Sequence, residues 1–192
     1  HAMLPSPGAQ AWPATFSPDG RYLAARYHDA IQVRQPYLLV WDLEKEQITG
    51  RVDNISLAAW HVFDQHSQRI AVVSGDSTIQ IRSLVDWNRQ AELVPGGHVD
   101  KILFADKGDQ LLVSNHGSKS VDFHSLAEAA TSLTKQVPLE FEATAMAWND
   151  ERRLLAVAEE NVIQVRNLEH PEQPPIELTG HRSRIVRLWL HP

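Results

Sequence analysis

Apolar and polar residues alternate in short runs along the chain, and the same alternation returns four times. Each first run ends in an aromatic residue with an apolar residue two positions before it. These aromatics are spaced 44 residues apart, at Phe16, Trp60, Phe104 and Trp148. A period of two puts both side chains on one face of a strand. Each run is therefore predicted to be a half-buried strand whose aromatic packs between neighbouring repeats.

Three further strands are expected in each repeat. Turn residues such as Pro18-Asp19-Gly20 follow the first strand, which predicts a hairpin. Second strands are then expected at 22–25, 70–73, 111–113 and 154–157. Third strands are expected to end at Leu43, Leu84, Leu126 and Leu168. Short fourth strands are expected near 48–52, 91–94, 138–141 and 176–179.

Two segments depart from this regularity. In the first repeat, both 31–34 and 37–43 have the pattern of a third strand. We favour 37–43, because Trp41-Asp42-Leu43 leads into a polar turn. In the third repeat, Ser125 and Glu128 have the spacing of a capping box and are followed by alanines. One or two helical turns are therefore predicted within 125–133.

Four short antiparallel strands in about 44 residues are typical of one propeller blade. Because one sheet cannot bury both of its faces alone, the repeats must stack into a single domain. We predict an all-β fold, a β-propeller of four complete four-stranded antiparallel blades plus one extra strand, as a partial propeller or a fragment of a larger one. Residues 1–10 are a tag remnant and lead-in, and 11–192 form the domain. The expected blades are about 11–54, 55–97, 98–141 and 142–181, with the first strand of a next blade at 182–192.

Three motifs resemble the WD40 repeat family: 16–20 (Phe-Ser-Pro-Asp-Gly), 40–43 (Val-Trp-Asp-Leu) and 178–181 (Leu-Thr-Gly-His). The resemblance implies structural roles for Trp41, Asp42, Gly180 and His181, with His181 hydrogen-bonded inside its blade. Only the first repeat keeps the Trp-Asp dipeptide, so the family's hydrogen-bond network is not expected to be complete in any repeat. The segment 174–181 also resembles junctions in large bacterial signalling proteins that carry propellers beside an NTPase or kinase module. This resemblance and the interrupted last repeat predict a longer, multidomain parent protein.

Composition narrows the classes of function. The 192 residues contain no cysteine and carry a net charge of −6, which excludes a disulfide framework and a thiol nucleophile and fits a cytoplasmic protein. No apolar run approaches the roughly 20 residues that span a bilayer. The arginines at 182, 184 and 187 lie near Trp189, but a nucleic-acid partner is not expected without a broad basic patch.

Motifs for catalysis are missing from the sequence. It contains neither a Gly-x-Ser-x-Gly elbow nor a phosphate-binding Gly-rich loop. His61 and His66 flank Asp64 without a recognised ligand spacing, and we interpret them as solvated loop histidines. We therefore expect no catalytic, cofactor or metal site. A metal- or histidine-dependent enzyme ranks below the other hypotheses.

The favoured hypothesis is a non-catalytic protein–protein interaction scaffold that presents propeller rim loops to a protein partner. The expected rim comprises 26–35, 53–54, 75–77, 96–100, 116–119, 159–161 and 182–184. The candidate partner-binding residues on it are Arg26, Tyr27, His28, His116, Arg182 and Arg184. The alternative is a self-assembling unit that forms a homodimer through open terminal blades, with the strand around 185–190 pairing with another copy.

Overall fold

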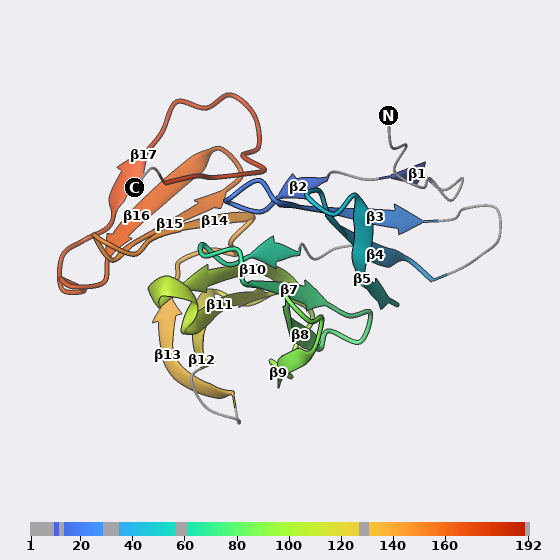
Figure 1. Cartoon of the computed structure of the whole chain (residues 1–192). Helices are drawn as coiled ribbons and strands as arrows, with labels where there is room; N and C mark the ends of the chain where they lie inside the picture. Colours follow the sequence, from blue (N-terminus) through green and yellow to red (C-terminus); the bar gives the residue numbers. More distant parts are fainter. Residues whose placement is uncertain (1–9, 12–13, 29–34, 57–60, 127–130, 191–192) are drawn as a thin grey trace. The chain divides into compact units, whose positions relative to one another are not determined.

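The computed structural model describes residues 10–11, 14–28, 35–56, 61–126 and 131–190 (Figure 1). Among them the fold is all-β, with four antiparallel sheets whose strands follow one another in chain order. The chain divides into two compact units, which we describe separately: unit 1 (His1–Gly96) and unit 2 (Gly97–Pro192). None of the described segments forms a helix with the length and apolarity needed to cross a membrane.

Unit 1 contains sheets I and II. The strands of sheet I are β1 (Gln10–Ala11), β2 (Thr15–Phe16), β3 (Tyr22–His28), β4 (Tyr37–Asp42) and β5 (Gln47–Asp53). Both β1 and β2 pair with β3, so two short strands share the first position of a four-position sheet. The strands of sheet II are β6 (Val62–Phe63), β7 (Arg69–Val73), β8 (Ile79–Ser83) and β9 (Arg89–Leu93).

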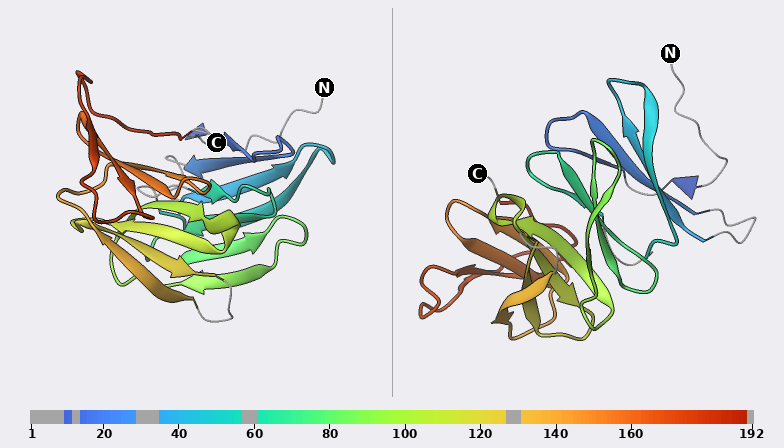
Figure 2. Two further views of the ribbon diagram at one scale, coloured as in Figure 1. Left: turned by 90° about the vertical axis from the view of Figure 1, so that its left-hand side faces the viewer. Right: turned by 60° about the horizontal axis from the view of Figure 1, so that its bottom comes forward.

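Unit 2 contains sheets III and IV, which Figure 2 shows in green to yellow and in orange. Sheet III consists of β10 (Val99–Ala105), the 3-10 turn η1 (Asp106–Gly108), β11 (Gln110–Asn115), β12 (Ser120–Ser125) and β13 (Ser132–Pro138). Sheet IV consists of β14 (Ala145–Asn149), β15 (Leu154–Glu159), β16 (Val162–Asn167) and β17 (Ile176–Leu178). The same strand order thus recurs in all four sheets.

The leucine that was expected to end each third strand has one role in all four sheets. Its backbone N–H donates to the carbonyl of the residue just before the second strand of the same sheet. The pairs are Leu43 with Arg21, Leu84 with Gln68, Leu126 with Asp109 and Leu168 with Arg153, at 2.8–2.9 Å. This bond closes one end of each central hairpin, and we call it the leucine closure.

Most of the expected strands are confirmed. The choice of 37–43 as the third strand of the first repeat holds, since β4 pairs with both β3 and β5. The competing segment 31–34 lies outside the described residues. The fourth strand of the third repeat was predicted too late, because β13 occupies 132–138.

The helical turns expected within 125–133 do not form at either end of that segment. Ser125 belongs to β12 and pairs with Ser132 of β13. Residues 127–130, which include Glu128 and the alanines, lie outside the described residues.

The expected first strand of a next blade is also absent. Residues 182–190 take up no strand pairing within the described chain. They pack onto sheet IV instead. Ile185 is buried in a cluster with alanines of β14 and β15, and Leu188 and Leu190 pack against the same cluster.

In unit 1 a core lies between the two sheets. Leu38 and Val40 of sheet I pack with Ile70 and Val72 of sheet II. The alternation of β4 sends Tyr37, Leu39 and Trp41 to the opposite face, where they form a second cluster with Tyr27. Both faces of β4 are therefore buried, so the open apolar face expected there is largely covered, although Phe16 at its edge is exposed.

Unit 2 repeats this arrangement. Leu112 and Phe123 of sheet III pack with Met146 and Leu155 of sheet IV. The far face of sheet IV carries small alanines, such as Ala145 and Ala158, and these are buried together with Ile185. The second open face expected from the sequence is therefore covered within the described residues.

The repeated aromatics do not all behave as expected. Trp148 packs edge-on against Phe123 with ring centroids 5.7 Å apart, which confirms its position between sheets. Phe104 is half-buried. Phe16 is 63% exposed, because it pairs with Leu23 on the face that turns away from sheet II, so its predicted burial is wrong. Trp60 lies outside the described residues.

Candidate functional site

One edge of unit 2 gathers five segments that are distant in sequence. Hydrogen bonds connect them: His116 N–H to the His98 carbonyl (2.7 Å), Leu139 N–H to Lys119 (2.8 Å), and the Asn161 side chain to the His181 carbonyl (3.0 Å). We call this edge the unit 2 rim and define it as residues 97–101, 116–119, 139–144, 160–161 and 180–185. Four of these segments overlap the expected rim, and the link 139–144 was not predicted to belong to it.

Three ionisable side chains converge on this rim. Nδ1 of His116 lies 3.1 Å from Oδ2 of Asp100 and 3.1 Å from Oε1 of Glu142. Asp100 belongs to the start of β10, His116 to the turn between β11 and β12, and Glu142 to the link between β13 and β14. The sheets therefore bring an imidazole and two carboxylates together from three segments.

The turn after β11 also holds Glu142 in place. Gly117 N–H donates to Glu142 Oε1 at 3.0 Å. Gly117 has φ +71°, a backbone conformation that glycine adopts without strain. This N–H, together with the nearby charges of His116 and Arg184, keeps the pKa of Glu142 below its ordinary value although burial opposes them. Glu142 is thus held as a carboxylate.

Cations face the same cluster. Burial lowers the pKa of Lys101, and the charge of Arg184 acts in the same direction, while Asp100 opposes both. The side chains of Asp100 and Glu142 are 20% and 37% exposed, and that of His116 is 69% exposed. The rim therefore presents both signs of charge to solvent within a small area.

The candidate partner-binding residues separate into two groups. His116, Arg182 and Arg184 are exposed on the unit 2 rim. Arg26 and Tyr27 are not loop residues, because they lie in β3 and are each only 8% exposed, so their expected exposure is wrong. Tyr27 stacks on Tyr37. His28 also belongs to β3, and its side chain lies outside the description.

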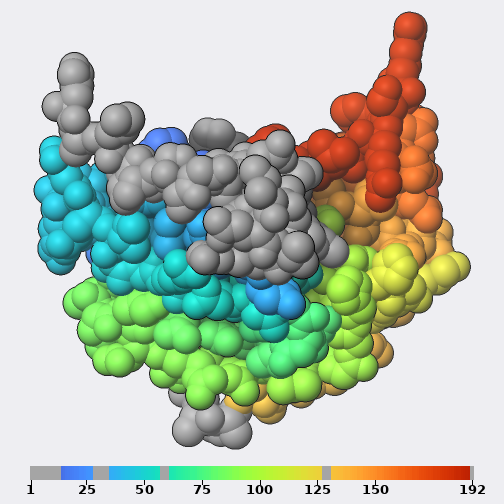
Figure 3. Space-filling view, turned by 90° about the vertical axis from the view of Figure 1, so that its right-hand side faces the viewer, coloured from blue at the N-terminus to red at the C-terminus, as the bar shows by residue number. Residues whose placement is uncertain are grey.

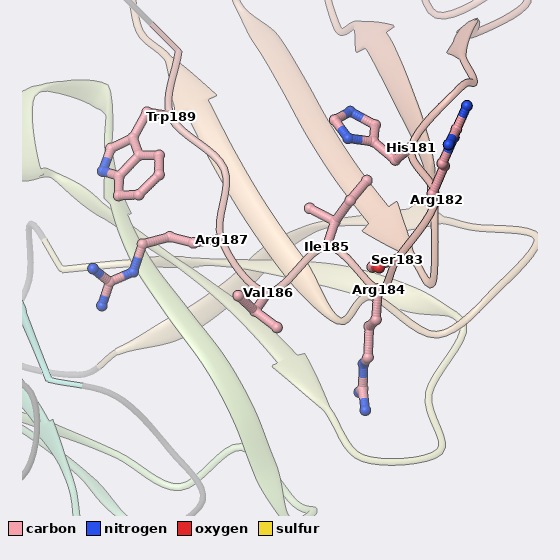
Figure 4. A pocket seen from close by; sticks show the side chains of 8 residues that line it. All are labelled: His181, Arg182, Ser183, Arg184, Ile185, Val186, Arg187 and Trp189. Carbon is pink, nitrogen blue, oxygen red and sulfur yellow. The ribbon is translucent and has the colours of Figure 1, made fainter.

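A shallow hollow follows the rim along the C-terminal segment. His181, Arg182 and Ser183 line one end of it, and Arg187 and Trp189 the other (Figure 4). The Arg187 guanidinium lies 5.5 Å from the centre of the Trp189 ring, which is 77% exposed. The chain after β17 stands out from the surface in red in Figure 3.

The residues of the Trp-Asp motif have local roles. Asp42 is buried, and it accepts hydrogen bonds from Arg21 (2.9 Å) and from the backbone N–H groups of Glu44 and Lys45. Its bond to Arg21 is the main reason that its pKa is lowered. The indole N–H of Trp41 has no hydrogen-bond partner in the described part of the chain. Asp42 therefore caps a turn.

The expected role of His181 is wrong. Gly180 takes φ +116°, and His181 after it is exposed. The carbonyl of His181, rather than its ring, accepts a bond from Asn161.

Two other histidines differ from the sequence interpretation. His66 is exposed, as expected, but His61 is buried and its Nε2 lies 2.6 Å from Thr15 Oγ1. His124 is 6% exposed, and neither ring nitrogen has a hydrogen-bond partner among the described residues. Burial lowers its pKa, while Asp122 opposes that shift.

Sequence reasoning did not single out Glu142. It lies 26 residues from His116, in a link without a motif of its own. Only the expectation that links and turns share a rim pointed toward it. Comparison of the chain with protein-family models and with curated proteins finds no match. What the structure establishes is an all-β protein of repeated four-stranded antiparallel sheets.

Proposed function

We propose that the four sheets are blades of a WD40-type β-propeller, and that the protein is a non-catalytic scaffold that docks a protein partner on the unit 2 rim. The strand order, the leucine closure of each sheet and the Trp41-Asp42 turn support the blade assignment. The lack of cysteine fits a cytoplasmic scaffold, and the resemblance of 174–181 to signalling proteins suggests its setting.

The observation that carries the docking role is the gathering of exposed charged groups on hydrogen-bonded turns. Strands hold both ends of 116–119 and 139–144, and Ile185 beside the arginines is buried on sheet IV, so binding orders little additional chain. Arg182 and Arg184 are exposed, and arginine is enriched among the residues that dominate interface energies. A partner that presents carboxylates to these arginines fits the rim.

Charge reversal tests this proposal. The protein is used as bait in a cell extract with a lysine-reactive cross-linker, and Arg182→Glu/Arg184→Glu is compared with Lys107→Glu/Arg152→Glu. The control residues are exposed on the turns at the opposite edge of unit 2. We expect a captured protein that cross-links to Lys119, at least tenfold less capture by the rim variant, and no change for the control. Equal capture by both variants would refute docking on this rim.

Self-assembly is the second candidate. It is favoured by the exposure of Val186 and Trp189 on a segment without strand pairing in the described chain, although the outer faces of sheets I and IV are largely buried. In this alternative a homodimer forms through that segment and completes a larger propeller. The solution mass over a tenfold concentration range tests it. A mass of twice 21.6 kDa that Trp189→Glu reduces to 21.6 kDa supports it, and a constant 21.6 kDa refutes it.

A further inference from the structure

The cluster of Asp100, His116 and Glu142 has the composition of a metal site. The ligand atoms of all three side chains lie within 4.8 Å of one another. We propose that these three residues bind a first-row transition-metal dication, and we take Zn²⁺ as the ion to test. The proposal concerns the metal alone and does not rest on the docking function.

The distances agree with such an ion. Bonds from zinc to imidazole nitrogen or carboxylate oxygen are about 2.0–2.2 Å long, so two ligand atoms on one ion lie about 3.0–3.6 Å apart. The two distances from His116 Nδ1, to Asp100 Oδ2 and to Glu142 Oε1, are both 3.1 Å. An ion placed between the three atoms therefore requires only small side-chain movements.

The kind of ligand atom selects the kind of metal. One nitrogen and two carboxylate oxygens suit borderline ions such as Zn²⁺, whereas Ca²⁺ and Mg²⁺ prefer oxygen alone. The two carboxylates also balance the charge of a dication. Because His116 is 69% exposed, water has access to the remaining coordination positions.

The surroundings organise the ligands and limit the affinity. Gly117 N–H donates to Glu142 at 3.0 Å and His116 N–H donates to the His98 carbonyl at 2.7 Å, so the turn and the link are already fixed. Arg184 acts electrostatically on Glu142 and Lys101, and Lys101 on Asp100. Both cations repel a metal ion. Replacing Arg184 is therefore expected to strengthen metal binding although it weakens the proposed docking.

Calorimetric titration of the chelator-treated protein with ZnCl₂ alone tests the site. We expect one saturable equivalent that His116→Gln and Glu142→Gln each weaken at least about tenfold. Arg184→Gln is expected to bind Zn²⁺ more tightly. The matched control is His170→Gln, because the His170 ring is paired with only one carboxylate, that of Glu172 at 3.5 Å. This control should leave Zn²⁺ binding unchanged.

A second measurement uses the unaltered protein, so the test does not depend on the folding of a variant. In a long-range ¹H–¹⁵N spectrum of the histidine rings, Zn²⁺ is expected to shift Nδ1 of His116 before any other ring nitrogen. Equal loss of binding in His170→Gln and His116→Gln, or a first shift at another histidine, would overturn the proposal. Loss of docking by Arg184 variants with intact Zn²⁺ binding would leave the metal site standing.

Discussion

The two units join their sheets by different chemistry. In unit 1 the backbone donor meets a neutral acceptor: Asp19 N–H donates to Ser67 Oγ at 3.1 Å, and Thr15 Oγ1 lies 2.6 Å from His61 Nε2. In unit 2 the carboxylate of Asp150 accepts the N–H groups of Asp106 and Lys107, at 2.7 and 3.1 Å. Asp150 also accepts from the Trp148 indole, and Arg153 pairs with Asp106.

The two contacts can be compared directly because an aspartate backbone N–H is the donor in both units. Asp19 and Asp106 both lie in the turn that follows the first strand of their sheet, and each offers its backbone N–H to the corresponding turn of the next sheet. A hydroxyl receives it in unit 1 and a carboxylate in unit 2. Hydrogen bonds to charged acceptors are roughly twice as strong as neutral ones. The fold thus places the donor, and one acceptor residue sets how firmly the sheets are joined.

The largest expected effect is the loss of the Asp150 carboxylate. Asp150→Ala removes the acceptor of two backbone N–H groups, and we expect it to lower the free energy of unfolding by about 3 kcal/mol. Urea unfolding followed by tryptophan fluorescence measures the change. The neighbouring exposed Glu151→Ala serves as the control and should change stability by less than about 0.5 kcal/mol. Equal effects of the two variants would contradict the comparison.

The second-largest expected loss of stability comes from an apolar contact between the two sheets of unit 1. Trp87 of sheet II lies against Gly50 of β5, where an added Cβ would be 2.3 Å from the indole ring. Gly50→Ala is therefore expected to lower stability by about 2 kcal/mol through overpacking.

Two variants check that explanation. At Gly97 an added Cβ would be 3.4 Å from the Asn115 side chain, so Gly97→Ala should have a smaller effect. Adding Trp87→Ala to Gly50→Ala should make the two losses less than additive in thermal unfolding. Full additivity would show that the ring is not the obstacle.

A third prediction compares Arg82 in the third strand of sheet II with His124 in the third strand of sheet III. Arg82 in unit 1 is half-buried and donates to Gln80 Oε1 and the Trp87 carbonyl, whereas His124, 42 residues later, is buried without a hydrogen-bond partner among the described residues. Since burial lowers the pKa of His124 below 6.5, only the unfolded chain takes up this proton just below that pH.

Stability is therefore expected to fall as the pH drops through 6.5 toward the lower folded pKa, and to be unaffected by this group above 6.5. The slope for one proton is at most about 1.4 kcal/mol per pH unit. His124→Gln should reduce it in urea unfolding at a series of pH values. An unchanged slope would assign the pH dependence to other groups.

The smallest effect tests the neutral acceptor directly. Ser67→Ala removes the hydroxyl that accepts the Asp19 N–H, and we expect a loss of about 1 kcal/mol. Ser67→Asp should lower stability further at low salt, since its carboxylate would lie beside that of Asp19, which the Ser67 hydroxyl contacts. Differential scanning calorimetry of both variants measures this. A loss from Ser67→Ala that equals the loss from Asp150→Ala would remove the distinction between the units.

The repeat was predicted well because the recurring alternation of apolar and polar residues reflects pairing between strands that are adjacent in the sequence. The alternation around Leu84 and Leu168 recurs with the strand period, and each leucine directly follows the last residue of its third strand, one position from the expected end. Burial of Tyr27 and His61 was missed because it depends on which segments cover them. Glu142 was missed because its partners lie in other segments, and no spacing rule links a turn to a distant strand connection.

The leucine closure has a consequence for protein engineering. From the carbonyl residue to the leucine, both included, the four hairpins contain 23, 17, 18 and 16 residues, yet all close with the same bond. Length differences are therefore absorbed at the opposite end, in the turn between the second and third strands. Foreign peptide loops grafted between Asn115 and Ser120 would be held by the same closure. Each sheet thus has one end fixed by the leucine closure and, at the other end, a turn that can be exchanged.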